Sequence, residues 1–297
     1  MLTPVIFGEV LFDIFESTHS VLGGAPFNVA WHLTGFGMNP VFISRVGNDA
    51  PGTEVLKKMS SWGMNKSGVQ TDHEHPTGRV RVEMHDKEPE YTIESDQAYD
   101  FIAPPEPAVL QHVDQTILYH GSLALRNAQS RLALSDLKKR SPVLVFFDVN
   151  LRQPWWKKET ILEELSDTDW LKCNEQELKE IIRLMGTPEK TREKLAFRVI
   201  EYFDLKGIVV TMGSKGALMV RNDGDVRYTN PNPVAELVDT VGAGDAFAAV
   251  TIMGLLKNWE GQQILDRASE FAAEICRIRG ATIERLELYQ SKNELWG

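Results

Sequence analysis

Apolar runs of strand length alternate with segments of helical periodicity along most of this 297-residue chain. The expected strands are rich in Val, Ile, Leu and Phe and cover residues 5–7, 41–43, 117–119, 143–147, 170–172 and 208–210. The expected helices cover residues 26–37, 53–62, 129–139, 175–185, 189–203 and 262–278. Continuous apolar strands separated by helices indicate a mainly parallel sheet with helices on both faces. The sequence therefore predicts a three-layer α/β/α core, formed by residues 1–297 as a single domain.

One stretch in the first half of the chain departs from this rhythm. Residues 77–83 and 90–95 alternate polar and apolar side chains, and the polar segment 85–89 lies between them. Such alternation is typical of an antiparallel hairpin with one face in water. We expect segments of about 12–22 and 70–100 to form a small β-sheet beside the core. It would serve as a lid over a site, as the contact of a homodimer, or as both.

The composition excludes several classes of protein. The formal charge is −10, and because general nucleic-acid binding relies on basic patches, no nucleic-acid partner is expected. No apolar run reaches the ~18 residues of a membrane-spanning helix, and the acidic Glu9 and Asp13 argue against a signal peptide. Cys173 and Cys276 form neither a metal motif nor a disulfide framework, which favours a reduced, cytoplasmic setting.

The stretch from 239 to 247 reads Asp-Thr-Val-Gly-Ala-Gly-Asp-Ala-Phe and places two glycines and a carboxylate where a loop enters an apolar helix. Backbone amides at a helix start are unpaired and attract anions, and glycines let an anion approach closely. Asp245 lies beside these amides and can accept a proton. Transfer of a phosphoryl group to an alcohol needs such an anion site with a base at its edge. The alternative is a helix start with two turn-forming glycines.

Polar residues also follow other expected strands, and ligands of parallel sheets bind at the carboxyl ends of the strands. Asp13 lies just past the first strand, and Asn28 lies one turn into a helix that Gly23 and Gly24 open. We expect Asp13 and Asn28 to face one pocket, although each alone also fits a surface acid or a helix cap. The polar group 148–152, which ends in Arg152, follows the strand at 143–147 in the same way.

Two further clusters are suited to a nucleotide. Asn174 and Glu177 share a helical face after the strand at 170–172, where one carboxylate acting through water is enough for a phosphate-bound Mg²⁺. They also fit a helix-capping pair, and both roles are compatible. Residues 211–216 form a glycine-rich turn with one lysine. The chain has no P-loop motif, and no G-x-G-x-x-G follows the first strand, which argues against a dinucleotide dehydrogenase.

Together and in this order, the clusters resemble the ribokinase-like (PfkB) family of sugar kinases over nearly the whole chain. The matching elements are Gly-Gly-x-x-x-Asn at 23–28, Gly-x-Asp-x-x-Gly at 47–52, Asn-x-x-Glu at 174–177 and the signature at 239–247. The resemblance implies a ribokinase-like core with a lid, ATP as phosphoryl donor, Mg²⁺, and K⁺ near the signature. It implies a small-molecule sugar as the other partner.

The resemblance also implies a role for each matched residue. Asp245 would be the catalytic base, and the anion hole would be Gly242, Ala243 and Gly244. The sugar ligands would be Asp13, Gly23, Gly24, Asn28 and Arg152. The nucleotide contacts would be Asn174, Thr211, Gly213 and Gly216. Glu177 would hold Mg²⁺ through water, and the carboxylate of Asp239 with the carbonyl of Val241 would form half of the K⁺ site.

The sugar is suggested by two segments. Gly-Gly-Ala-Pro-x-Asn, with Asp-x-Asn-x-Arg-x-x-Trp-Trp at 148–156, looks most like the fructokinases of this family, which implies phosphorylation of fructose to fructose 6-phosphate. A kinase for 2-keto-3-deoxygluconate or for another sugar or nucleoside is the alternative. A sugar acid would favour a cation in the pocket, and the candidates are Arg79, Arg81, Arg126 and Arg152. A third alternative is a non-catalytic sugar or nucleotide sensor, against which the intact Asp245 and its glycines argue.

Overall fold

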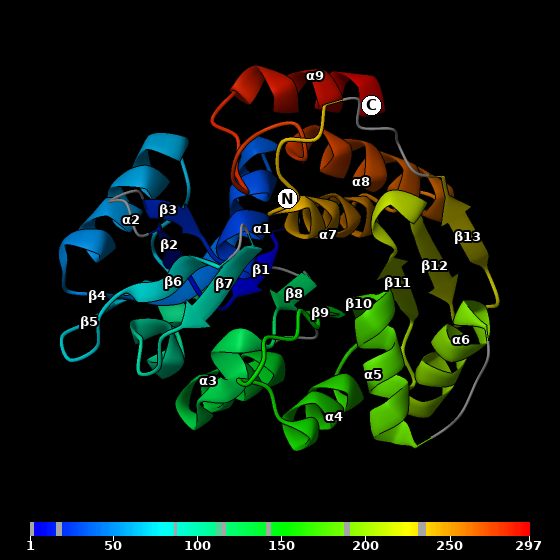
Figure 1. The fold of residues 1–297 in the computed structure, drawn as a ribbon, viewed down its shortest axis with the longest axis horizontal. Helices are drawn as coiled ribbons and strands as arrows, with labels where there is room; N and C mark the ends of the chain where they lie inside the picture. The colour runs from blue at the N-terminus through cyan, green and yellow to red at the C-terminus, as the bar shows by residue number, and fades with distance from the viewer. Residues whose placement is uncertain are drawn as a thin grey trace.

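The computed structural model describes residues 3–15, 20–85, 88–111, 113, 117–140, 144–186, 191–230 and 236–297. Within these residues the chain forms one large sheet between two layers of helices, and a small sheet at one side (Figure 1). In the same part of the chain, no helix combines the length and the apolar character needed to cross a bilayer.

The large sheet has nine strands in the described residues, in the order β13-β12-β11-β10-β9-β8-β1-β4-β5. Their bounds are β1 Val5–Phe7, β4 Val41–Gly47, β5 Val69–Asp72, β8 Ile117–His120, β9 Leu144–Asp148, β10 Trp170–Asn174, β11 Gly207–Thr211, β12 Ala217–Arg221 and β13 Val226–Thr229. Every pair of neighbouring strands from β11 to β5 in this order is parallel. Strands β12 and β13 pair antiparallel and form one edge of the sheet. The strand order reverses beside β1, and such a reversal opens a crevice at the carboxyl ends of the strands.

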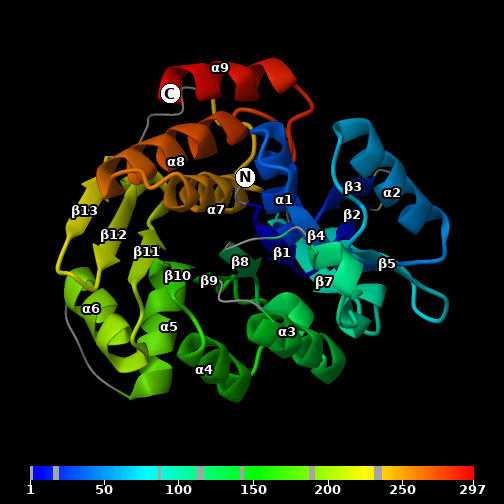
Figure 2. The same ribbon diagram turned by 180° about the vertical axis from the view of Figure 1, so that it is seen from behind.

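Helices cover both faces of this sheet (Figures 1 and 2). One layer contains α1 Ala25–Gly35, α2 Ala50–Trp62, α7 Ala243–Leu256, α8 Gly261–Ile275 and α9 Leu286–Trp296. The other contains α3 Ala128–Arg140, α4 Lys158–Ser166, α5 Glu175–Met185 and α6 Arg192–Phe203. Alternate residues of one strand serve opposite cores: Ile6 packs in the first layer, and Val5 and Phe7 pack in the second. The strands are apolar throughout because both of their faces are buried.

The small sheet has the order β3-β2-β6-β7, with β2 Leu11–Phe15, β3 Ser20–Gly23, β6 Gly78–His85 and β7 Glu88–Ile93. Strands β6 and β7 pair antiparallel, which confirms the predicted hairpin. Two details of the prediction are wrong. The segment 69–72 is β5 and pairs with β4 in the large sheet, so this part of the small sheet begins at Gly78. Residues 85, 88 and 89 continue the paired strands, where the sequence predicted a polar connection.

The Gly-x-Asp-x-x-Gly element connects the two sheets. Asp49 is the N-cap of α2, where its Oδ1 accepts hydrogen bonds from the amide of Gly52 at 2.8 Å and the hydroxyl of Thr77 at 2.6 Å. Its Oδ2 accepts the amide of Thr77 at 2.9 Å. Because Thr77 directly precedes β6, these bonds hold the base of the small sheet against α2.

Candidate active site

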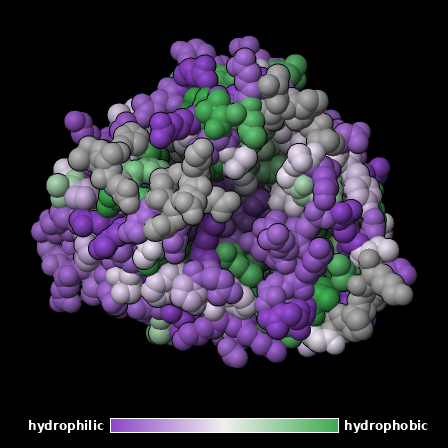
Figure 3. All heavy atoms as spheres, viewed as in Figure 1, coloured by the Kyte–Doolittle hydropathy of each residue, from purple (hydrophilic) through white to green (hydrophobic). Residues whose placement is uncertain are grey.

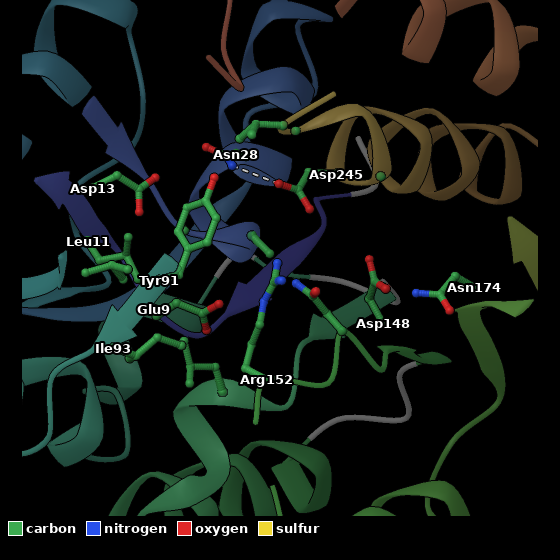
Figure 4. Close-up of a pocket in the computed structure, with 18 of the residues that line it drawn as sticks. Glu9, Leu11, Asp13, Asn28, Tyr91, Ile93, Asp148, Arg152, Asn174 and Asp245 are labelled. Atoms are coloured by element: carbon green, nitrogen blue, oxygen red, sulfur yellow. Dashed lines mark hydrogen bonds between the residues drawn. The ribbon is translucent and has the colours of Figure 1, made fainter. Parts of the chain in front are cut away.

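A polar pocket of about 440 Å³ lies at the carboxyl ends of the central strands and under the small sheet (Figure 4). The face seen in Figure 1 is hollowed near its centre, with hydrophilic residues around the hollow (Figure 3). The pocket is lined by predicted site residues from widely separated segments: Asp13, Gly24, Asn28, Arg152, Asn174, Glu177, Thr211, Val241, Gly242, Gly244 and Asp245. Asp13 and Asn28 therefore share one pocket, as predicted.

The carboxylate of Asp245 is held by the first helix of the chain. Helices α1 and α7 pack against each other, and Asn28 Nδ2 donates a hydrogen bond to Asp245 Oδ2 at 2.8 Å (Figure 4). Burial raises the pKa of Asp245 to about 6, while the bond from Asn28 lowers it and the nearby Asp148 raises it. A general base works best when its pKa lies near the working pH, so this carboxylate has the properties of a base.

The start of α7 needs glycine at residue 242. Gly242 has φ +79°, and a Cβ there would lie 2.4 Å from Cα and Cβ of Ala281, so another side chain would meet both strain and a clash. Gly242 and Gly244 line the polar pocket. Ala243, the third residue of the predicted anion hole, differs from these two glycines. Its amide already donates to the carbonyl of Thr240 at 3.3 Å, and the residue lines the neighbouring pocket described below.

A buried ion pair that was not predicted from the sequence lies beside this helix start. Lys172 Nζ lies 2.7 Å from Asp148 Oδ2, and the two residues are 6% and 2% exposed. The hydroxyl of Tyr119 donates to the same oxygen at 3.3 Å. A methyl group placed on Gly244 would lie 3.7 Å from Lys172 Nζ, so the ammonium adjoins the anion-binding end of α7. The available signal was a lysine inside an apolar strand, between Leu171 and Cys173.

The other end of the pocket is acidic with one arginine facing it. Asp13 of β2 and the buried Glu9, which follows β1, lie opposite Arg152 (Figure 4). Burial raises the pKa of Asp13 to about 6, and Arg152 lowers it. Tyr91 and Ile93 of β7 close this end from the small sheet. Glu9 was not predicted as a site residue.

The structure separates the four candidate arginines. Arg152 lines the polar pocket. Arg126 binds both carboxylate oxygens of Asp100 at 2.6 Å, and Arg81 binds Glu94 at 2.8 Å. Arg79 lies 4.0 Å from Asp49.

Gly24 lines the pocket, whereas Gly23, the other glycine of the pair, lies in the small sheet. Gly23 pairs with Leu11 in the small sheet, and a Cβ on it would lie 3.8 Å from Asp13 Oδ2. Gly23 thus lies beside the side chain of Asp13 and is not among the residues that line the pocket.

Asn174 and Glu177 form the predicted capping pair of α5. Asn174 Oδ1 accepts the amide of Glu177 at 2.9 Å, and Glu177 Oε2 accepts the amide of Asn174 at 2.8 Å. Glu177 Oε1 accepts the amide of Leu151 at 2.9 Å. Burial raises the pKa of Glu177. Among the described residues no group of three His, Cys, Asp or Glu could hold a metal ion by itself, so a cation here would need substrate oxygens or water as further ligands.

A second, mostly apolar pocket of about 600 Å³ adjoins the first. Thr211, Gly213 and Gly216, to which the family resemblance assigns nucleotide contacts, line it. Ala243 and Gly244, predicted for the anion hole, also line it, and the remaining wall, which was not predicted as a site, comes from Ser214, Leu237, Thr240, Phe247, Ser269, Ala272, Ala273 and Cys276. The two pockets share Thr211, Thr240 and Gly244, so they meet at the start of α7.

Asp239 joins two loops near this junction. Its Oδ1 accepts the amide of Val241 at 3.0 Å, and its Oδ2 accepts the amide of Gly280 at 3.1 Å. The carboxylate thereby holds the loop before α7, to which the family resemblance assigns half of a K⁺ site, against the loop after α8.

A buried carboxylate at a helix start, close to where a polar pocket meets an apolar one, is the arrangement expected of a small-molecule kinase. The family described as pfkB family carbohydrate kinase matches residues 9–287, and the chain belongs to this family. It is a sugar kinase, a phosphotransferase with an alcohol group as acceptor.

Several relatives are similar over most of their length. The uncharacterized sugar kinase PH1459 of Pyrococcus horikoshii is 30% identical over 268 residues, which cover 84% of this chain and 81% of the relative. Its structure in complex with ATP has a TM-score of 0.79, with 25% identity and full coverage of both chains. Fructokinase-2 of Zea mays is 26% identical and covers 98% of this chain and 93% of its own length. Fructokinase of Vibrio cholerae O395, solved with fructose, ADP and calcium, has a TM-score of 0.79 at 24% identity, with 98% of each chain covered.

Proposed function

We propose that this protein transfers the γ-phosphoryl group of ATP to fructose and forms fructose 6-phosphate. The observation that carries the proposal is the place of Asp245, at the start of α7 where the polar and the apolar pockets meet. An acceptor hydroxyl in the polar pocket would reach both this base and a phosphoryl group entering from the apolar pocket. The similarity to Fructokinase-2 of Zea mays supports fructose as the acceptor.

The charges of the polar pocket favour a neutral acceptor. Its sugar end carries Glu9 and Asp13, with Asp245 at its inner side, opposite the single guanidinium of Arg152. Hydroxyl groups can donate to such carboxylates, whereas the carboxylate of a sugar acid would be repelled by them. The side chain of Arg126, another candidate cation, is buried and is already paired with Asp100.

In the proposed reaction Asp245 accepts the proton of the attacking hydroxyl, and Asn28 keeps its carboxylate turned toward the pocket. The amides at the start of α7 and the ammonium of Lys172 stabilise the negative charge of the phosphoryl group in transfer. The apolar wall of Phe247, Ala272 and Ala273 is suited to the adenine ring. The small sheet would keep water from the acceptor, because Tyr91 and Ile93 already border the pocket.

The residues present fit two cations. Glu177 and Asn174 face the polar pocket with Asp148, and this oxygen set suits a Mg²⁺ held partly by water and partly by phosphate. Mg²⁺ would neutralise the charge of the phosphate oxygens. The carboxylate of Asp239 and the carbonyl of Val241 would hold K⁺, which would stiffen the two loops that Asp239 already joins. A homodimer through the small sheet stays a prediction, which light scattering would test.

The test is a coupled assay of ADP release with fructose, 2-keto-3-deoxygluconate, other hexoses and ribonucleosides, each with Mg²⁺ and with either K⁺ or Na⁺. The highest kcat/KM for fructose supports the proposal. A higher value for the sugar acid would replace fructose with that acceptor. If none of these compounds releases ADP, the catalytic proposal fails and sugar binding without turnover is the remaining function.

A further inference from the structure

The segment that follows β1 places a carboxyl group in the wall of the polar pocket. Glu9 is 3% exposed and lines the pocket. Gly24 holds this segment in place: it has φ +109°, and a Cβ on it would lie 2.8 Å from the carbonyl oxygen of Glu9. The absence of a side chain at residue 24 thus lets the start of α1 pack directly on the backbone of Glu9.

The carboxyl group of Glu9 lacks a hydrogen-bond partner for one oxygen. Among the residues that the structure describes, no group bonds to Glu9 Oε2, although the atom is buried. Asn28 Oδ1, on the same pocket, is buried and unpartnered in the same way. Buried polar atoms are costly unless they are hydrogen-bonded, and the large majority in native structures have a partner. Two unpaired acceptors on one pocket wall indicate a ligand that carries hydroxyl donors.

The surroundings of Glu9 keep its side chain directed to the pocket. Its carboxyl lies below Tyr91 and points toward Arg152 (Figure 4). Burial, helped by the nearby Asp245, raises the pKa of Glu9 to about 7, against the opposing effects of its own backbone amide and of Arg152 and Arg126. The hydroxyl groups of Tyr99 and Tyr119 also interact electrostatically with Glu9.

We propose that Glu9 is a further acceptor-binding residue, whose carboxyl group binds a sugar hydroxyl that is not phosphorylated and so selects the hydroxyl that reaches Asp245. The inference rests on the proposed function, since it needs a polyhydroxylated acceptor. A structural role is the competing explanation, because Arg126 Nη1 and the hydroxyl of Tyr99 are also buried and unpartnered among the described residues.

The test compares Glu9→Ala and Glu9→Gln with the control Glu164→Gln. Glu164 of α4 is also buried, at 7% exposure, and binds Lys138 at 2.7 Å away from the pocket. We expect Glu9→Ala to raise the KM for fructose about tenfold or more, the effect of one lost hydrogen bond to a charged group. The KM for ATP should change less than twofold. Glu9→Gln keeps the shape and one acceptor and should lie between wild type and Glu9→Ala, while Glu164→Gln should leave both KM values unchanged.

A second readout does not depend on turnover. Fructose should raise the Tm of the wild type in the absence of ATP, and this rise should be reduced in Glu9→Ala. An unchanged KM for the acceptor, or equal rises in the KM for fructose and for ATP, overturns the role of Glu9. If the wild type prefers another acceptor, the fructose proposal fails, and the KM of Glu9→Ala for that acceptor decides the role of Glu9. If no compound is phosphorylated, the loss or retention of the Tm rise decides it.

Discussion

The side-chain amide of Asn28 donates a 2.8 Å hydrogen bond to Oδ2 of Asp245, across 217 residues of sequence. The bond orients the carboxylate and lowers its pKa against the effect of burial. Asn28 also presents its unpartnered Oδ1 in the polar pocket. In the proposed function, a sugar hydroxyl bound to this oxygen would therefore be coupled to the proton affinity of Asp245 through one amide group.

Replacement of Asp245 by Asn should abolish most of the turnover. A general base contributes ~10²–10⁴-fold, so we expect kcat to fall at least about a hundredfold while the KM for the sugar changes little. Steady-state kinetics of ADP release measure both values. Wild-type turnover in this variant would remove Asp245 from the mechanism.

Replacement of Asn28 by Ala should change the pH profile. Asp245 must be ionised to accept a proton, and its pKa is about 6, so wild-type kcat/KM should fall as the pH drops through about 6. The bond from Asn28 lowers this pKa, and its loss should shift the acid limb to higher pH and raise the KM for the sugar. Profiles of kcat/KM between pH 5 and 8 measure the shift, and an acid limb at the same pH in both proteins would contradict the coupling.

Replacement of Lys172 by Met should affect both stability and turnover. The change leaves the buried Asp148 unpaired, and breaking a buried ion pair costs about 3–5 kcal/mol of unfolding free energy. The double change Lys172→Met with Asp148→Asn should recover much of that stability. It should not restore kcat, which we expect to fall roughly a hundredfold with the loss of one charge-stabilising donor, and Asp148→Asn also removes a charge from the proposed Mg²⁺ ligands. Urea unfolding and kinetics of both variants separate the two effects, and recovery of kcat in the double variant would show that Lys172 acts only in folding.

The raised pKa of Glu9 predicts a pH-dependent cost in the folded state. Its pKa rises from 4.5 to about 7 on folding, so between these values the folded protein binds more protons than the unfolded chain. Stability from this group is therefore present below pH 4.5 and lost as the pH rises through 7. The Glu9→Gln variant has no titrating group at residue 9. Its free energy of unfolding, relative to that of the wild type, should therefore increase by about 3 kcal/mol between pH 4.5 and 7.5. Urea unfolding at both pH values measures the difference; a constant difference would show that Glu9 does not titrate in this range.

Elements with strong local patterns were predicted well, and those that depend on packing were not. The helix at 175–185 and the capping pair Asn174 and Glu177 appear as predicted, because both signals lie within a few residues. Strand β13 and helix α9 were missed. Two of the four residues of β13 are exposed, so it has no apolar run, and α9 buries Tyr289 and Trp296 only because α1 and α8 lie beneath it.

By itself the sequence determined the parallel α/β core, the hairpin and the glycine-rich start of α7, because periodicity, turn chemistry and helix-start chemistry act over a few residues. Only the tertiary structure decided that Asn28 meets Asp245, that Lys172 joins Asp148 beside Gly244, and that the carboxyl of Glu9 faces the pocket. These groups come from different strands and helices, and their distances depend on the strand order around β1 and on the packing of α1 against α7. Such contacts leave no short-range pattern in the chain.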